Sequence, residues 1–119
     1  MRLDPDNNKC RLALNRAKKS EQLKEKGNEL IKENKFAEAA EAYTEALSLD
    51  PANKKLNSIV YSNRALTFMK RKDWLKALDD LNKSIELDPN YTKSLMRRAE
   101  VQMERGEYTA ASMDYSKIQ

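Results

Sequence analysis

The feature that most constrains the fold of this 119-residue chain is an internal repeat. The tripeptide Leu-Asp-Pro occurs at residues 3–5, 49–51 and 87–89. Because proline cannot continue a helix, each tripeptide is expected to close one. Repeat starts at Ser20, Ser58 and Thr92, which are 38 and 34 residues apart, bring similar residues to the same positions.

Small and bulky residues recur at fixed places in this register. The small residues, at positions 8 and 20, are Gly27, Ala65 and Ala99, and Ala39, Ala77 and Ala111. The bulky residues, at positions 17 and 24, are Phe36, Trp74 and Tyr108, and Tyr43, Leu81 and Tyr115. Small residues allow two helices to touch closely, and bulky ones fill the gaps between them. We therefore interpret both sets as packing positions, the aromatic residues at position 17 included.

The composition indicates an all-α fold. Only two glycines and three prolines interrupt the chain, so β-hairpins are difficult to place. The first helices are predicted near 11–33, 54–70 and 91–105, and the second helices near 36–49, 73–87 and 107–118. The longer first spacing adds four residues between Pro51 and Tyr61, which predicts an additional turn at the start of the second repeat.

This pattern resembles the 34-residue tetratricopeptide repeat, in which each helix-turn-helix buries its apolar face only against its neighbours. Leu23 replaces the usual tryptophan at position 4, and Gln102 is polar at position 11. The resemblance implies three tandem repeats in a right-handed superhelical stack with a concave peptide groove. The repeats would span 20–53, 54–91 and a truncated 92–119. Residues 1–19 would be the tail of a preceding repeat and a leading basic helix.

Several functional classes are disfavoured by residues that the chain lacks. It contains no histidine and one cysteine, Cys10, which excludes Ser-His and Cys-His nucleophile systems and most transition-metal sites. Gly27 and Gly106 stand alone, so the usual glycine-rich phosphate loops are absent. We therefore expect a protein that is not an enzyme and that binds no cofactor or metal.

The charge pattern bears on partners and location. Lys and Arg number 23 and Asp and Glu 19, but the two signs alternate along most of the chain, so nucleic acid is not the expected partner. No apolar run approaches the roughly 18 residues of a membrane span, and the N-terminus does not resemble a signal peptide. We expect a monomeric module of a larger cytoplasmic or nuclear protein that does not bind membranes.

Three segments resemble the dicarboxylate-clamp tetratricopeptide domains of heat-shock co-chaperones. They are KEKGN at residues 24–28, YSNRA at 61–65 and KSLMRRA at 93–99. The resemblance implies that Lys24, Asn28 and Asn63 hold the terminal carboxylate of a Glu-Glu-Val-Asp tail. Lys93 would hold the aspartate side chain, and Arg97 the peptide backbone and neighbouring oxygens. Such tails end the 70- and 90-kilodalton heat-shock chaperones.

Further residues are expected around these five. The implied accessory peptide contacts are Ile31, Ser62, Leu66, Met69 and Lys70. Other positions that would point into the groove are Lys32, Met96, Glu100 and Glu104. A chain end with two carboxylates requires several fixed donors, and charge-assisted hydrogen bonds contribute about 1.5 to 3 kcal/mol each.

The four-residue insertion and the long basic helix over 8–26 most resemble the second tetratricopeptide block of DnaJ-type co-chaperones, although this chain carries no J domain. Immunophilin-type and phosphatase-type co-chaperones share the clamp and remain open as relatives. Two other functions also remain open. One is a scaffold that binds an internal peptide or another repeat domain, and the other is a basic RNA-binding solenoid.

Overall fold

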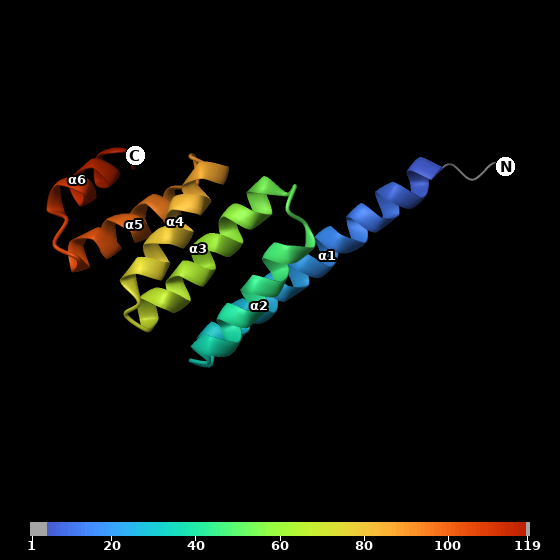
Figure 1. The fold of residues 1–119 in the computed structure, drawn as a ribbon, viewed down its shortest axis with the longest axis horizontal. Helices are drawn as coiled ribbons and strands as arrows, with labels where there is room; N and C mark the ends of the chain where they lie inside the picture. Colours follow the sequence, from blue (N-terminus) through green and yellow to red (C-terminus); the bar gives the residue numbers. More distant parts are fainter. Residues whose placement is uncertain (1–4, 119) are drawn as a thin grey trace.

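The computed structural model describes residues 5–118, most of which form six α-helices. They are α1 (Pro5–Lys32), α2 (Phe36–Leu49), α3 (Lys54–Lys70), α4 (Trp74–Leu87), α5 (Thr92–Glu104) and α6 (Tyr108–Ser116). Consecutive helices pair into three hairpins that follow one another through an elongated molecule (Figure 1). The predicted all-α class and the predicted pairing of helices are confirmed, with no strand among the described residues.

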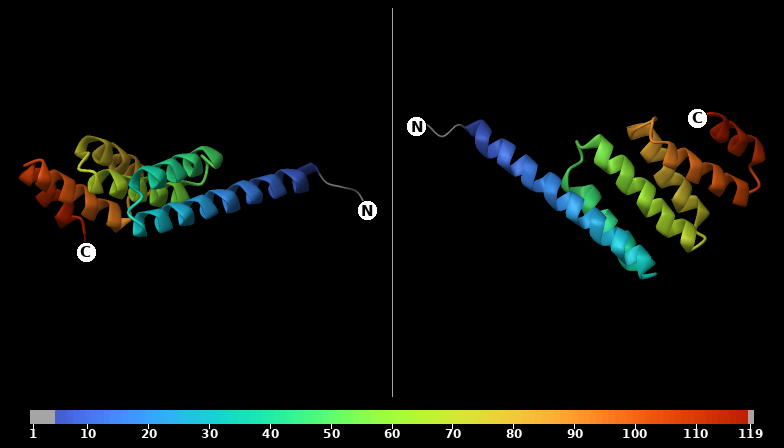
Figure 2. Two further views of the ribbon diagram at one scale, coloured as in Figure 1. Left: turned by 90° about the horizontal axis from the view of Figure 1, so that it is seen from below. Right: turned by 180° about the vertical axis from the view of Figure 1, so that it is seen from behind.

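Helix α1 differs most from its expected bounds, because it begins at Pro5 rather than near residue 11. Its N-terminal half extends beyond α2 and the other hairpins (Figures 1 and 2). Proline is well suited to the first turn of a helix, where its missing N–H group has no partner in any case. The expectation that residues 3–5 close an earlier helix is therefore wrong at Pro5, and Leu3 and Asp4 lie outside the described residues.

The turn inside each hairpin has the same backbone conformation. Asn34, Lys72 and Gly106, all at position 15 of their repeats, have positive φ angles of 61°, 61° and 77°. The residue directly after each of these three donates its backbone N–H to the carbonyl oxygen five residues earlier, with N···O distances of 2.7–2.8 Å. This bond satisfies a carbonyl at the end of the first helix and reverses the chain. The turns therefore align successive hairpins in one register.

The predicted small positions lie at the closest helix contacts. Gly27 is buried, and the five alanines at positions 8 and 20 have no exposed surface. Tyr43 and Leu81, at position 24, are also fully buried, each in a cluster that includes residues of the next hairpin. The core therefore continues from one hairpin into the next, as an open stack requires.

Two aromatic residues of the third hairpin are more exposed than their counterparts in the first two hairpins. Tyr108 is 64% exposed and Tyr115 is 47% exposed, although their counterparts Phe36, Trp74, Tyr43 and Leu81 are half-buried or buried. The interpretation of Tyr108 as a core residue is therefore wrong. The physical reason is that, within residues 5–118, no further hairpin packs against the outer side of α6.

Helix α3 is four residues longer than α5, with 17 residues against 13. Its additional turn lies at its start, where the sequence has the extra residues. There the Asn53 side chain accepts a hydrogen bond from the Leu56 N–H, and the Asn57 amide donates to the Asp50 carbonyl. The first bond caps the lengthened helix, and the second ties it to the residue that follows α2.

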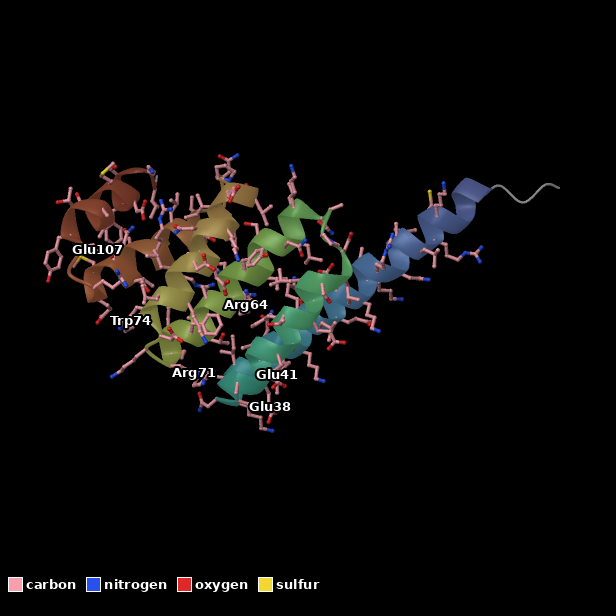
Figure 3. All side chains as sticks on the ribbon, viewed as in Figure 1. Glu38, Glu41, Arg64, Arg71, Trp74 and Glu107 are labelled. Atoms are coloured by element: carbon pink, nitrogen blue, oxygen red, sulfur yellow. The ribbon has the colours of Figure 1, made fainter. Side chains whose placement is uncertain are left out.

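Two arginine–aspartate pairs join the helices within hairpins. Arg64 on α3 donates to both carboxylate oxygens of Asp80 on α4, each at 2.8 Å. Arg98 on α5 pairs in the same way with Asp114 on α6, at 2.7 Å. Both aspartates are 3% exposed, and Figure 3 places Arg64 in the middle of the stack. Each pair lies between the two helices of one hairpin, and each arginine charge is balanced by its aspartate. These arginines are therefore not available to bind a ligand's carboxylate.

We predict that Asp80→Asn destabilises the protein by roughly 2 to 4 kcal/mol, because it leaves a half-buried guanidinium without its carboxylate. Urea unfolding followed by circular dichroism measures the change. The neighbouring Asp79→Asn is the matched control, because the Asp79 side chain is 68% exposed and, among the described residues, pairs only with Lys83 on the surface. Its effect should stay below about 0.5 kcal/mol. Equal effects of the two substitutions would contradict a structural role for the Asp80 pair.

Candidate functional site, a groove along the first helices

The first helices of the hairpins form the walls of a groove. Helix α3 contacts both α1 and α5, so α3 lies between them. A hollow of about 340 Å³, here called the proximal hollow, is lined by Glu25, Asn28, Glu29, Ile31, Lys32, Asn63, Leu66, Lys93 and Arg97. Four of the five residues predicted to bind a carboxylate lie here, namely Asn28, Asn63, Lys93 and Arg97. They come from three different helices.

A hydrogen-bond network orients the two asparagines of the proximal hollow. The Asn28 carbonyl oxygen accepts from the Tyr43 hydroxyl and from the Asn63 amide, the latter at 3.0 Å. Both acceptor positions of this oxygen are therefore occupied. Among the described residues nothing accepts from the Asn28 NH₂ group, which leaves its two N–H donors available to a ligand.

Arg97 is held by a single nitrogen of its guanidinium. Its Nη1 donates to the Ser62 carbonyl at 2.9 Å, to the Ser62 hydroxyl at 3.0 Å and to the Asn63 side-chain oxygen at 3.3 Å. Within residues 5–118, its Nε and Nη2 donors have no protein acceptor. The hydrogen bonds of Nη1 thus fix the Arg97 side chain in place, while the N–H groups of Nε and Nη2 remain available to a ligand.

Ser62 was expected to contact the peptide, and this expectation is wrong. Ser62 has no exposed surface, so a ligand in the groove cannot reach it. Its two oxygens instead hold the Arg97 guanidinium. Sequence position alone places Ser62 beside the groove, but the approach of α5 to α3 covers it.

Arg97 differs electrostatically from the other two half-buried arginines. The hydrogen bonds that Arg64 and Arg98 donate to their aspartate partners raise the pKa of each guanidinium above its ordinary value. Desolvation lowers the pKa of Arg97, and none of the ion pairs among the described residues involves it. A cation that loses water without gaining a carboxylate is a site where an anion is favoured.

The two predicted lysines have different environments. Lys93 is exposed at the edge of the proximal hollow, and no described residue pairs with it. The Lys24 side chain is 13% exposed, and its Nζ lies 3.5 Å from carboxylate oxygens of both Glu21 and Glu25. Lys24 does not line the hollow. In this structure the Lys24 ammonium pairs with two carboxylates of its own helix. Its predicted role in peptide binding therefore stays a prediction.

The predicted accessory residues divide between two hollows. Ile31 and Leu66 line the proximal hollow. A second one, here called the distal hollow, has a volume of about 370 Å³ and is lined by Leu66, Met69, Lys70, Trp74, Glu100 and Glu104. Met96, also expected in the groove, lines neither and is 47% exposed. Trp74 was interpreted only as a packing residue, but it also forms part of this second wall.

Other site types find no support within residues 5–118. No helix there is both long enough and apolar enough to cross a membrane. No group of three or more histidine, cysteine, aspartate or glutamate residues is placed to hold a metal ion in the same part of the chain. Cys10 is exposed on α1 as a free thiol.

Comparison with known families identifies the repeat. Tetratricopeptide repeats are matched at residues 20–53 and again at residues 58–91. The first tetratricopeptide domain of Spaghetti (RPAP3), solved with the HSP90 peptide SRMEEVD, is 31% identical and superposes with a TM-score of 0.80 over 86% of this chain and 80% of that one. This chain belongs to the tetratricopeptide repeat family. The resemblance seen in the sequence is thereby confirmed.

Two other comparisons concern larger proteins and a second bound peptide. DnaJ homolog subfamily C member 7 of Homo sapiens is 37% identical over 99% of this chain, and the Dictyostelium discoideum homolog is 39% identical over 98%. The chain spans only 24% and 22% of these two relatives. The second human RPAP3 domain, solved with the HSP70 peptide SGPTIEEVD, has a TM-score of 0.74 and 28% identity over 88% of this chain and 82% of that one.

We predict that Gly27→Ala destabilises the protein by about 1 to 3 kcal/mol, because the added Cβ would lie 2.5 Å from the Tyr43 ring. At an exposed helix position, a glycine-to-alanine change stabilises a protein by about 1 kcal/mol. The sign of the change in stability therefore shows whether the added Cβ meets the Tyr43 ring. Urea unfolding provides the measurement. Asn15→Ala, on the exposed part of α1, is the control for helix propensity and should be neutral or slightly stabilising. A stabilising Gly27→Ala would show that α1 and α2 do not approach this closely.

Proposed function

We propose that the groove binds the free C-terminus of an acidic peptide of the Glu-Glu-Val-Asp type, as found at the ends of 70- and 90-kilodalton heat-shock chaperones. The observation that carries this proposal is the guanidinium of Arg97, which has no carboxylate partner among the described residues. It lies in the same hollow as the open amide donors of Asn28 and the exposed ammonium of Lys93. The chain would then serve as a chaperone-binding module of a co-chaperone.

The arrangement of donors suits a chain end better than an internal segment. A C-terminal aspartate carries two carboxylates close together, and each accepts several hydrogen bonds. Asn28 and Asn63 would take the main-chain carboxylate, and Lys93 the side-chain carboxylate. The Nε and Nη2 donors of Arg97 would bind the remaining oxygens in a bidentate manner. Lys24 would join them after leaving Glu21 and Glu25.

Structural relatives support this assignment of ligand. The two RPAP3 domains that superpose on this chain hold peptides ending in Glu-Glu-Val-Asp. The relationship to DnaJ homolog subfamily C member 7 supports a co-chaperone as the parent protein. Because the chain spans less than a quarter of that relative, any activity of a whole co-chaperone goes beyond what this module alone would do.

The scaffold and RNA-binding alternatives make different demands on the ligand. A scaffold for an internal peptide requires no terminal carboxylate, and an RNA-binding surface requires a run of cations at phosphate spacing. In the proximal hollow, Glu25 and Glu29 stand beside Lys93 and Arg97. Phosphates along a nucleic-acid backbone would meet those two carboxylates, whereas a short carboxylate end can be bound at the cations alone.

We predict that Lys93→Ala weakens binding of a free-acid SRMEEVD peptide by roughly tenfold to a hundredfold, because one charge-assisted contact is lost. Stability should change by less than about 0.5 kcal/mol, because the side chain is exposed and unpaired within the described part. Isothermal titration calorimetry measures the affinity. Lys19→Ala, an exposed cation on α1 outside the groove, is the matched control and should have little effect.

The peptide's own terminus provides the second arm of this test. Amidation removes the terminal charge and should weaken wild-type binding by at least tenfold. An amidated peptide that binds as tightly as the free acid would overturn the carboxylate proposal in favour of a scaffold. Tighter binding of single-stranded RNA than of either peptide would favour the nucleic-acid alternative. Arg97→Ala is less suitable as a test, since Arg97 also donates hydrogen bonds to both Ser62 oxygens, and its loss would leave those buried oxygens without this donor.

A further inference from the structure

The first hairpin forms one end of the stack, and its outer side is uncovered (Figure 1). Within residues 5–118, α1 contacts only α2 and α3. A hollow of about 300 Å³ on this side, here called the outer hollow, is lined by residues of α1 and α2 alone. It shares no residue with the proximal or the distal hollow, so a partner bound here would leave the groove free.

Charges of opposite sign lie in separate rows on the two helices of this side. Helix α2 contributes Glu38, Glu41 and Glu45 to the outer hollow, and Figure 3 labels the first two. Helix α1 contributes Lys26, and Lys19 lies two turns earlier on the same face of α1. All five side chains are exposed, and none forms an ion pair among the described residues. Both rows are therefore available to charges of another molecule.

An apolar strip separates the two rows. It consists of Leu23 and Leu30 of α1, both half-buried, and Ala42 of α2. A face with cations on one helix, carboxylates on the other and apolar atoms between them is complementary to a second copy of itself. A two-fold axis parallel to the hairpin brings α1 of one copy opposite α2 of the other. An axis across the hairpin would instead place the two basic rows against each other.

The pairing of the two helices determines which charges would meet. The Ser20 hydroxyl donates to the Ala46 carbonyl at 2.9 Å, so Lys19 and Glu45 lie at the same level of the hairpin. Rotation about an axis parallel to the hairpin keeps each residue at its level. Lys19 of one copy therefore comes opposite Glu45 of the other. Two turns along the antiparallel helices, Lys26 comes opposite Glu38 in the same way.

We propose that the outer side of the first hairpin is an interface between two copies of this chain, related by a two-fold axis parallel to the hairpin. The lysines of each copy would bind the glutamates of the other, and the apolar strips would pack across the axis. Helix α2 has 14 residues, and a face about 21 Å long and about 20 Å wide buries roughly 400 Å² per copy. Interfaces of this size are transient, so the chain would be monomeric at low micromolar concentration.

Sedimentation equilibrium of the wild-type chain at about 50 mM salt, with protein up to about 1 mM, tests for the dimer. We expect a monomer–dimer equilibrium that weakens by about threefold or more at roughly 500 mM salt, because exposed ion pairs are screened. Two charge-reversal variants locate the interface. Lys19→Glu with Lys26→Glu, and Glu38→Lys with Glu45→Lys, should each weaken self-association by about tenfold or more, because like charges then face each other across the axis.

An equimolar mixture of the two variants is the decisive measurement. One variant carries only acidic rows and the other only basic rows, so a mixed dimer should form at least as tightly as the wild-type dimer. Sedimentation velocity with one variant labelled at the exposed Cys10 detects it. Lys54→Glu with Lys55→Glu, at exposed sites on α3 that line none of the three hollows, is the matched control and should dimerise like the wild type.

Three outcomes would overturn the inference. One is a wild-type chain that stays monomeric over the whole concentration range at low salt, and another is a dimer that both charge-reversal variants retain. The third is a mixture that stays monomeric although circular dichroism shows both variants to be folded. None of them bears on peptide binding, because the outer hollow and the groove share no residue. Lys93→Ala, which tests the groove, should accordingly leave the dimer unchanged.

Discussion

The close approach of the two helices within each hairpin is the constraint on which the groove depends. At Gly27 the absence of a Cβ lets the Tyr43 ring lie directly against α1. The same contact brings the Tyr43 hydroxyl to the Asn28 side chain and so orients an amide of the groove. Desolvation raises the pKa of Tyr43 well above its ordinary value, so the hydroxyl keeps its proton and remains a donor. A packing feature of the first hairpin thus determines which atoms of Asn28 face a ligand.

Consecutive residues on the first helices of the second and third hairpins face different surroundings, the groove at position 6 and the interior of the hairpin at position 7. Asn63 and Arg97, at position 6 of their repeats, lie in the proximal hollow, while Arg64 and Arg98, at position 7, pair with aspartates of the second helices. One residue corresponds to a rotation of about 100° on a helix, which is enough to move a side chain from the groove to the interior of the hairpin. Aspartates of the second helices therefore neutralise Arg64 and Arg98 inside the hairpins. This arrangement leaves Arg97, whose partners among the described residues are neutral oxygens, as a cation that is open to an anion.

The sequence alone predicts much of this architecture because its signals are local and repeated. Small residues at positions 8 and 20 are buried, as expected, and the helix pairs follow their order along the chain. The errors arise where a residue's environment depends on neighbours that the repeat register does not specify. Ser62 is covered by Arg97 from the next hairpin, and Tyr108 lacks a following hairpin within residues 5–118. The roles of Tyr43 in orienting Asn28 and of Trp74 in the distal hollow also depend on contacts between helices.

The donors in the proximal hollow are already in position before any ligand arrives. Asn28, Asn63 and Arg97 are linked by hydrogen bonds that join three hairpins, so their side chains need not be ordered on binding. The entropy cost of association would then fall mainly on the peptide, which is extended and flexible when free. Preorganisation of this kind raises affinity without adding contacts. Lys93 and Lys24 lack the same support from neighbouring hairpins, so their contribution would come from charge and would weaken with added salt more than that of the asparagines.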